Sequence, residues 1–134
     1  MGVRVPRGEL TVVLGPPIVR RRLMAMLDAG GPGVRWVPTG SGTATERVRR
    51  VEALAEGAPA LVLAERVTDG LDAGGRRLVL AALRDLARAE PAGPAVLVDD
   101  DDVVAALAVA DSTLRADPWR GLVVDPVELP ALSA

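Results

Sequence analysis

Three short aliphatic runs constrain what this chain can fold into more than any other feature. They are Leu10–Leu14, Ala60–Ala64 and Ala95–Val98, and a breaker or a cluster of charged residues follows each one. The runs are continuously apolar rather than alternating, which is typical of strands buried on both faces of a parallel sheet. Between them, apolar residues recur at helical spacing, most clearly over residues 75–88. This alternation predicts an α/β fold with a parallel sheet.

The rest of the chain continues the same alternation. We expect further helices over residues 19–27, from Thr43 up to Gly57, and over 103–110, and further short strands over 34–37 and 121–124. The length of 134 residues suits one domain. We therefore predict a single α/β domain over residues 1–125 and a C-terminal tail over residues 126–134.

Composition excludes several kinds of function. There is no cysteine and no histidine, which excludes thiol catalysis, a histidine base and the usual zinc sites. The net charge of −2 and the presence of only two aromatic residues, both tryptophan, argue against nucleic acid as a partner. No apolar run reaches the roughly 18 residues of a membrane span, and no signal peptide is evident, so we expect a cytoplasmic protein without direct membrane insertion. All the basic residues are arginine, a bias that we attribute to a GC-rich bacterial genome.

The ends of the apolar runs indicate where a site would lie. Ligands of parallel sheets bind beyond the carboxyl ends of the strands. Gly15–Pro17, Glu65–Arg66 and Asp99–Asp102 occupy those ends in this sequence. We expect these three segments to meet.

Several motifs resemble those of the ATP-binding-cassette (ABC) ATPases. Residues 41–48 (SGTATERV) resemble the signature motif SGGxxQRV, and residues 61–72 (LVLAERVTDGLD) resemble four apolar residues followed by DEPTSGLD, without a gap. Residues 9–16 (ELTVVLGP) are similar to the strand and the start of the phosphate-binding loop. Residues 96–98 match the strand before the switch His-Asp, and Asp101-Asp102 stand where the family places that His-Asp. Residues 110–114 (ADSTL) match ADRVL. The resemblance covers the chain from about Gly8 to Leu114, with the motifs in the family's order.

This resemblance implies a P-loop-NTPase-like core with flanking helices and a vestigial nucleotide site for ATP and Mg²⁺. Glu65 would stand at the position that holds Mg²⁺. The resemblance also implies an ABC-type ATPase or permease as a partner, a head-to-tail homodimer or heterodimer, and an attachment to the membrane only through that partner. The family's positions for binding nucleotide fall here on Gly15, Arg20, Arg21, Arg22, Ser41, Gly42 and Asp72, with Arg20 or Arg21 near the position of the phosphate-binding lysine.

The departures from the family pattern predict that ATP is bound weakly or not at all and is not hydrolysed. Pro16 and Pro17 have no N–H group to offer a phosphate. Arg66 replaces the catalytic glutamate, and a cation cannot act as a general base toward water. Asp101 replaces the switch histidine, so we assign no catalytic residue. The short segment between Leu27 and Ser41 leaves no room for the family's helical subdomain.

Simpler interpretations stand beside these. Arg20–Arg22 also suit a solvated helix face, Glu65–Arg66 a strand-end ion pair, and Asp99–Asp102 the N-cap of a helix rather than a metal site. Repulsion among the four aspartates predicts a raised pKa for one of them. For the whole chain, the favoured function is a degenerate ABC-type domain that serves as an interaction or regulatory module, or as a half-site partner. The alternatives are a weak Mg-ATP-binding or slow ATPase subunit of an ABC transporter, and a flavodoxin-like scaffold, which strand order would distinguish.

Overall fold

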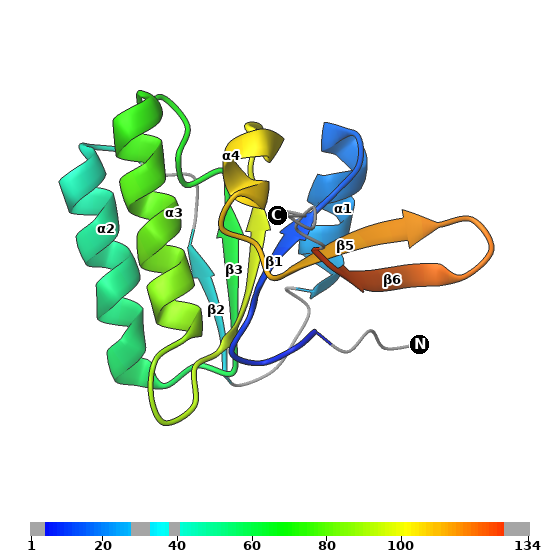
Figure 1. The fold of residues 1–134 in the computed structure, drawn as a ribbon, viewed down its shortest axis with the longest axis horizontal. Coiled ribbons are helices and arrows are strands. Elements are labelled where there is room, and N and C mark those ends of the chain that lie inside the picture. The colour runs from blue at the N-terminus through cyan, green and yellow to red at the C-terminus, as the bar shows by residue number, and fades with distance from the viewer. Residues whose placement is uncertain (1–4, 28–32, 38–40, 128–134) are drawn as a thin grey trace, which may run out of the picture.

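A six-stranded, mostly parallel sheet forms the centre of the protein (Figure 1). The computed structural model describes residues 5–27, 33–37 and 41–127. The strand order is β2-β3-β4-β1-β5-β6; the first five strands are parallel and β6 is antiparallel to β5. The strands are β1 (Leu10–Val13), β2 (Val34–Val37), β3 (Leu61–Glu65), β4 (Ala95–Asp99), β5 (Ser112–Asp117) and β6 (Gly121–Pro126). The predicted α/β fold is confirmed.

Helices cover both faces of the sheet, as the continuous apolar strands require. On one face α1 (Pro17–Leu27) packs Leu23 and Met24 against Leu63 and Leu97 of the sheet. The other face carries α2 (Ala44–Ala53), the 3₁₀ helix η1 (Leu54–Gly57), α3 (Ala73–Ala87) and α4 (Val103–Leu107). No helix in the described part of the chain is both long and apolar enough to cross a membrane.

The strand order overturns the flavodoxin-like alternative. A flavodoxin-like sheet has the order 2-1-3-4-5. Here β4 lies between β3 and β1, with Val62 paired to Val96 and Leu10 also paired to Val96. The carboxyl ends of β1, β4 and β3 are therefore adjacent in the sheet.

Local signals account for the helix boundaries. Thr43 begins α2 with a capping box: its side chain accepts from the Glu46 N–H, and the Glu46 carboxylate accepts from the Thr43 N–H. Helix α1 begins two residues before the predicted start, because Pro17 suits the first helical position. Helix α4 ends at Leu107, short of the predicted residue 110.

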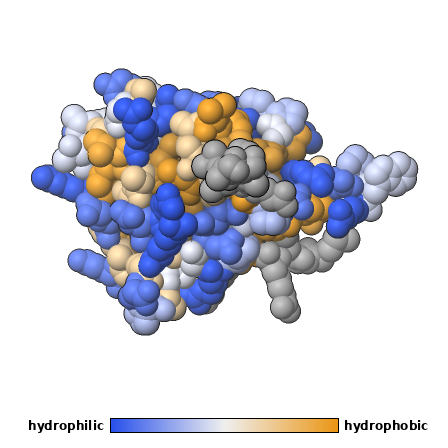
Figure 2. All heavy atoms as spheres, in the orientation of Figure 1, coloured by the Kyte–Doolittle hydropathy of each residue, from blue (hydrophilic) through white to orange (hydrophobic). Residues whose placement is uncertain are grey.

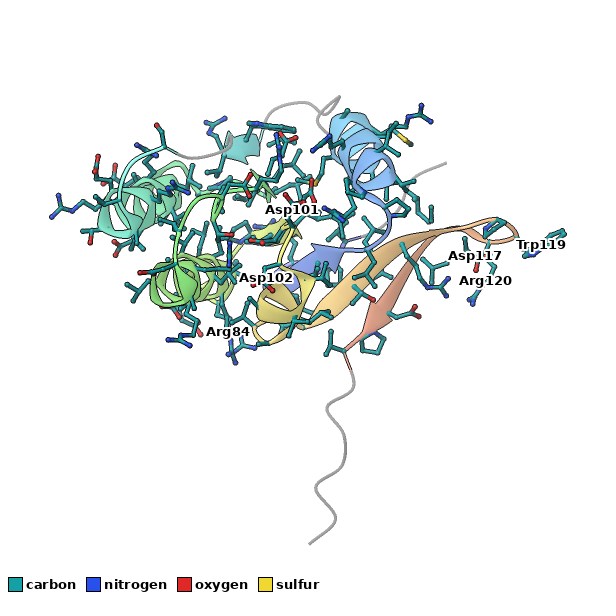
Figure 3. All side chains as sticks on the ribbon, turned by 90° about the horizontal axis from the view of Figure 1, so that it is seen from above. Arg84, Asp101, Asp102, Asp117, Trp119 and Arg120 are labelled. Carbon is teal, nitrogen blue, oxygen red and sulfur yellow. The ribbon has the colours of Figure 1, made fainter. Side chains whose placement is uncertain are left out.

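The last two strands form a hairpin that the sequence prediction captured only in part. Residues 112–117 were not predicted as a strand, because this half-buried segment mixes polar and charged residues with apolar ones. Strand β6 was predicted over 121–124 and extends to Pro126. The hairpin projects from the body, and Trp119 and Arg120 lie at its far end (Figure 3). Most of the predicted tail, residues 128–134, lies outside the described residues.

Candidate functional site

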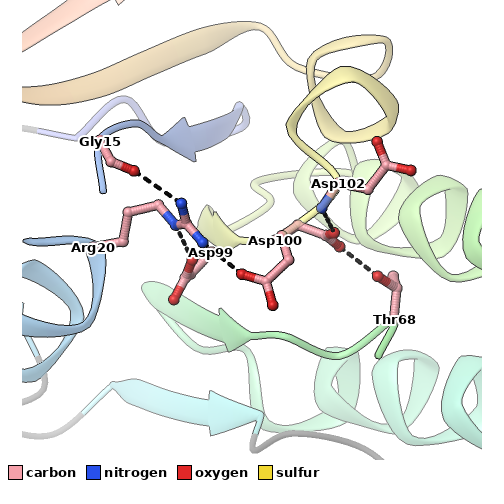
Figure 4. Close-up of polar contacts among 7 residues, drawn as sticks. Gly15, Arg20, Thr68, Asp99, Asp100 and Asp102 are labelled. Atoms are coloured by element: carbon pink, nitrogen blue, oxygen red, sulfur yellow. Dashed lines mark hydrogen bonds and ion pairs between the residues drawn. The ribbon is translucent and has the colours of Figure 1, made fainter. Parts of the chain in front are cut away.

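The three expected segments meet at the carboxyl edge of the sheet (Figure 4). The backbone N–H of Arg66, after β3, donates to the carbonyl of Asp99 at the end of β4 at 2.7 Å. Arg20 of α1 reaches the carbonyl of Gly15, after β1, and also contacts Asp99. The prediction that these three segments meet is confirmed.

Arg20 is held on all three guanidinium nitrogens by groups of the same chain. Its Nε donates to Asp99 Oδ1 at 2.6 Å, its Nη2 to Asp101 Oδ1 at 2.6 Å and its Nη1 to the Gly15 carbonyl at 2.8 Å. The Arg20 side chain is 7% exposed and that of Asp99 1%, whereas that of Asp101 is 52% exposed. We call Gly15, Arg20, Asp99 and Asp101 the Arg20 cluster. Its cation has two carboxylate partners already in place.

The loop before α1 is a helix start rather than a phosphate cradle. The Pro16 carbonyl accepts from the N–H groups of Val19 and Arg20 at 2.9 and 3.0 Å, and the Leu14 N–H donates to the Leu114 carbonyl. Pro16 and Pro17 have no N–H group. The loop therefore offers few of the converging donors that a phosphate requires.

The other two candidate arginines lie elsewhere on α1. Arg21 and Arg22 are exposed, so the interpretation as a solvated helix face holds for them and is wrong for Arg20. Helical periodicity explains why these three arginines differ in burial, because Arg20 shares a face with the buried Leu23 and Met24.

Glu65 and Arg66 lie at the end of β3 and are both half-buried. Arg66 has a positive φ of 46°, which turns the chain away from the strand. Its Nε is buried and has no hydrogen-bond partner within the described residues. The same described residues contain no group of three or more acidic side chains arranged to hold a metal ion.

Asp100 belongs to a second polar group beside the Arg20 cluster. It is buried and accepts from Thr68 Oγ1 at 2.6 Å and from the Asp102 N–H at 2.8 Å. Burial raises the pKa of Asp100, and these two hydrogen bonds only partly offset the rise. The predicted raised pKa in the aspartate run is confirmed, but the main cause is burial, and the charge of Asp102 contributes least.

Asp102 supplies the helix cap that the sequence suggested. Its Oδ1 accepts from the Ala105 N–H at 3.0 Å at the start of α4. Its Oδ2 pairs with Arg76 of α3 at 3.2 Å, and Arg76 also donates to Thr68 Oγ1. Of the four consecutive aspartates, Asp99 and Asp101 thus share Arg20, Asp100 bonds to Thr68 and to the Asp102 N–H, and Asp102 caps the helix.

Ser41 and Gly42 lie exposed just before α2. Their carbonyls accept from Arg50 Nη1 at 2.8 Å and from Arg47 Nε at 3.1 Å. Asp72 is exposed and caps α3 by accepting from the Gly75 N–H at 2.7 Å. Within the described residues, no hydrogen bond joins these three to the Arg20 cluster.

Arg47 is the structural residue that sequence reasoning missed. It is 7% exposed, and its Nη1 donates to the carbonyls of Val67 and Asp69 at 3.1 and 2.6 Å. Arg47 also donates to the Gly42 carbonyl, so its hydrogen bonds connect the loop before α2 to the turn after β3. The sequence predicted this helix, and no role was predicted for Arg47. The signal was available, because Arg47 precedes the buried Val51 by four residues and so shares its face.

The strand order of the parallel sheet, with helices on both of its faces, is that of a P-loop-NTPase-like α/β core. This fold is the one found in ABC ATPase domains. An ATP-binding subunit of an ABC transporter aligns over 92% of this chain and 80% of its own, with 14% identity and a TM-score of 0.59. The RNase-L inhibitor aligns over 91% of this chain with 16% identity and a TM-score of 0.61. A bacterial ABC exporter with ATP bound aligns over 91%, with 14% identity and a TM-score of 0.57.

These likenesses establish the fold and not the activity. The chain spans 35% of the RNase-L inhibitor chain and 34% of the exporter chain. No protein-family model matches the sequence, and no curated protein matches it.

Proposed function

We propose that this chain is an ABC-type domain that does not hydrolyse ATP and acts as an interaction or regulatory module. The observation that carries the proposal is the Arg20 cluster. A nucleotide phosphate would have to displace Asp99 and Asp101 from Arg20, and both pairs have oxygen–nitrogen distances of 2.6 Å. Asp99 would then remain as a buried, unpaired carboxylate, which is costly.

The residues that replace the catalytic groups support the absence of hydrolysis. Arg66 cannot accept a proton from an attacking water at neutral pH. Asp101 is already paired with Arg20 and carries a negative charge next to the position where the phosphate charge would develop. Phosphoryl transfer depends on positioning and on stabilising that charge, so each replacement opposes catalysis.

Calorimetric titration with ATP, with and without Mg²⁺ and up to millimolar ligand, tests the proposal. We expect no Mg²⁺-dependent heat from the wild-type chain. Asp101→Asn is the matched variant, because it removes the more exposed carboxylate and leaves the buried pair in place. A dissociation constant of the wild-type chain for Mg-ATP below about 100 μM, or about −5.5 kcal/mol, would contradict the proposal that Asp99 and Asp101 block Arg20. It would favour a weak Mg-ATP-binding or slow ATPase subunit that uses Arg20, Glu65 and Mg²⁺.

A second candidate is the role of half-site partner, and the exposed Ser41–Gly42 loop favours it. Arg47 and Arg50 hold this loop by its carbonyls, which leaves the Ser41 side chain accessible. In a head-to-tail dimer the loop would close the nucleotide site of a competent ABC ATPase. Such a partner would also be the chain's link to a permease and to the membrane, from the cytoplasmic side. Ser41→Arg should then abolish ATP hydrolysis by a co-purified ATPase subunit, and unchanged hydrolysis would remove this candidate.

A further inference from the structure

An apolar groove runs between α2 and α3 on the outer side of the helical layer. Val48, Glu52 and Ala55 line one side, and Leu78, Ala82 and Asp85 line the other. Its volume is about 440 Å³. Leu78 is 59% exposed, although it is a large aliphatic residue on a well-formed helix. Figure 2 shows apolar surface over the helical layer, surrounded by hydrophilic residues.

The shape of the groove suits a helix. On one side, Val48 and Glu52 of α2 and Ala55 of η1 follow at spacings of four and three residues. On the other side, Leu78, Ala82 and Asp85 of α3 follow at the same spacings. From residue 78 to residue 85, seven helical steps at about 1.5 Å span about 10 Å, or two turns. Alanine on both walls allows a third helix to approach the pair closely, as in ridges-into-grooves packing.

The charge of the groove selects among possible occupants. Among the residues that the structure describes, Glu52 and Asp85 are the only charged ones that line the groove, and both are acidic and exposed. Neither forms an ion pair within the described residues. An anionic membrane or a nucleic acid would be repelled by these carboxylates, whereas a helix with basic residues beside its apolar stripe would complement them.

We propose that the α2–α3 groove binds an amphipathic helix of a partner protein, with leucine-like residues in the groove and arginine or lysine facing Glu52 and Asp85. The inference rests on the proposed role as an interaction module and names the chemistry of its partner. None of the lining residues belongs to the Arg20 cluster, so groove binding and nucleotide binding can be tested separately.

A designed peptide is the probe. It is a capped helical 16-mer with leucine at three positions spaced by four and three residues, arginine on both sides of that stripe and alanine elsewhere. A matched peptide carries glutamate in place of each arginine. Each is titrated into the ¹⁵N-labelled full chain while amide chemical shifts are followed. We expect the arginine peptide to shift amides of α2 and α3 and to bind about tenfold more tightly than the glutamate peptide, since each of two exposed ion pairs contributes about threefold.

Two variants make the test specific. Leu78→Glu places a charge in the groove and should weaken the arginine peptide at least tenfold. The control is Val104→Glu on α4, an aliphatic residue that is 80% exposed and does not line this groove, and it should leave binding unchanged. The double variant Glu52→Arg with Asp85→Arg should reverse the preference between the two peptides.

Equal binding of both peptides, shifts located away from α2 and α3, or equal effects of the Leu78 and Val104 substitutions would each overturn the inference. If neither the peptides nor ATP bind, the groove proposal fails and the proposal that Arg20 is blocked by Asp99 and Asp101 stands. If the arginine peptide binds as expected and Mg-ATP also binds tightly, the groove proposal stands and the proposal of a blocked nucleotide site fails.

Discussion

Replacement of Arg20 by methionine is expected to lower the free energy of unfolding by about 3–5 kcal/mol, the range for removing one partner of a buried ion pair. Methionine keeps much of the aliphatic volume of the arginine side chain and removes its three donors. The Asp99 carboxylate, only 1% exposed, then has no cation and cannot turn to water. The Gly15 carbonyl also loses its side-chain donor.

The two carboxylates of the cluster should contribute unequally. Asp101 is 52% exposed, so its pair with Arg20 resembles a surface salt bridge, worth about 0.2–1 kcal/mol. Asp101→Asn should therefore cost no more than about 1 kcal/mol. Most of the stability lost in Arg20→Met comes instead from leaving the buried Asp99 carboxylate without a cation. Asp99→Asn in the Arg20→Met background should therefore recover a large part of the free energy of unfolding.

Urea unfolding followed by far-ultraviolet circular dichroism measures these differences. A thermal scan provides a second reading, since about 1 kcal/mol corresponds to roughly 4 °C in a domain of this size. The matched control is Arg21→Met, an exposed arginine on the same helix, which should stay within about 0.5 kcal/mol of wild type. If Arg20→Met costs no more than Arg21→Met, or if the double variant is no more stable than Arg20→Met, the buried pair is not what holds the cluster together.

Three further changes have expected outcomes. Arg47→Met should lower the free energy of unfolding by about 2–3 kcal/mol, because it leaves the carbonyls of Val67 and Asp69 without their side-chain donor. Amide exchange in the turn after β3 should also become faster, and an unchanged exchange rate there would contradict this role of Arg47. Asp100 has a pKa raised by burial, so its contribution to stability is complete below about pH 3.8, the unfolded value, and is lost as pH rises through the folded value. Stability of wild type relative to Asp100→Asn should thus fall with pH above 3.8, by up to about 1.4 kcal/mol per unit, and a flat difference would show that the folded pKa is not raised. Gly93→Ala should lower the melting temperature, because its Cβ would collide with the backbone carbonyl of Ala87, and no loss would show that this turn can move.

The sheet was the most predictable part of the protein. Strands β1, β3 and β4 are aliphatic except for Thr11 and for Glu65 and Asp99 at their carboxyl ends, so composition alone identifies them and the covered faces of the sheet. The edge hairpin was less predictable, because β5 is half-exposed and carries Arg115 and Asp117, which pair with each other at 3.0 Å. Polar residues that form an ion pair do not produce an apolar pattern in the sequence.

The meeting of the three segments was predictable, whereas the contacts between their side chains were not. The ends of the strands indicated which segments meet, because carboxyl ends of neighbouring parallel strands lie at one edge. The pairing of Arg20 with Asp99 spans 79 residues and depends on how α1 is rotated on the sheet. Adjacent residues in the run of aspartates also differ sharply, since Asp100 is buried and Asp101 is exposed. Neither distinction is encoded in local spacing.

The choice of arginine at position 20 has a physical consequence that the two prolines of the loop alone do not have. A guanidinium presents several N–H donors in a rigid plane, whereas a lysine ammonium is a compact, mobile point charge. Arg20 uses that plane to hold Asp99, Asp101 and the Gly15 carbonyl together. Lysine could not reproduce this fixed set of contacts. Arg20→Lys should therefore be less stable than wild type. If the contacts of the guanidinium plane are what prevents ATP binding, this variant should also bind ATP more tightly. A stable variant with no gain in ATP binding would show that the prolines of the loop prevent ATP binding instead.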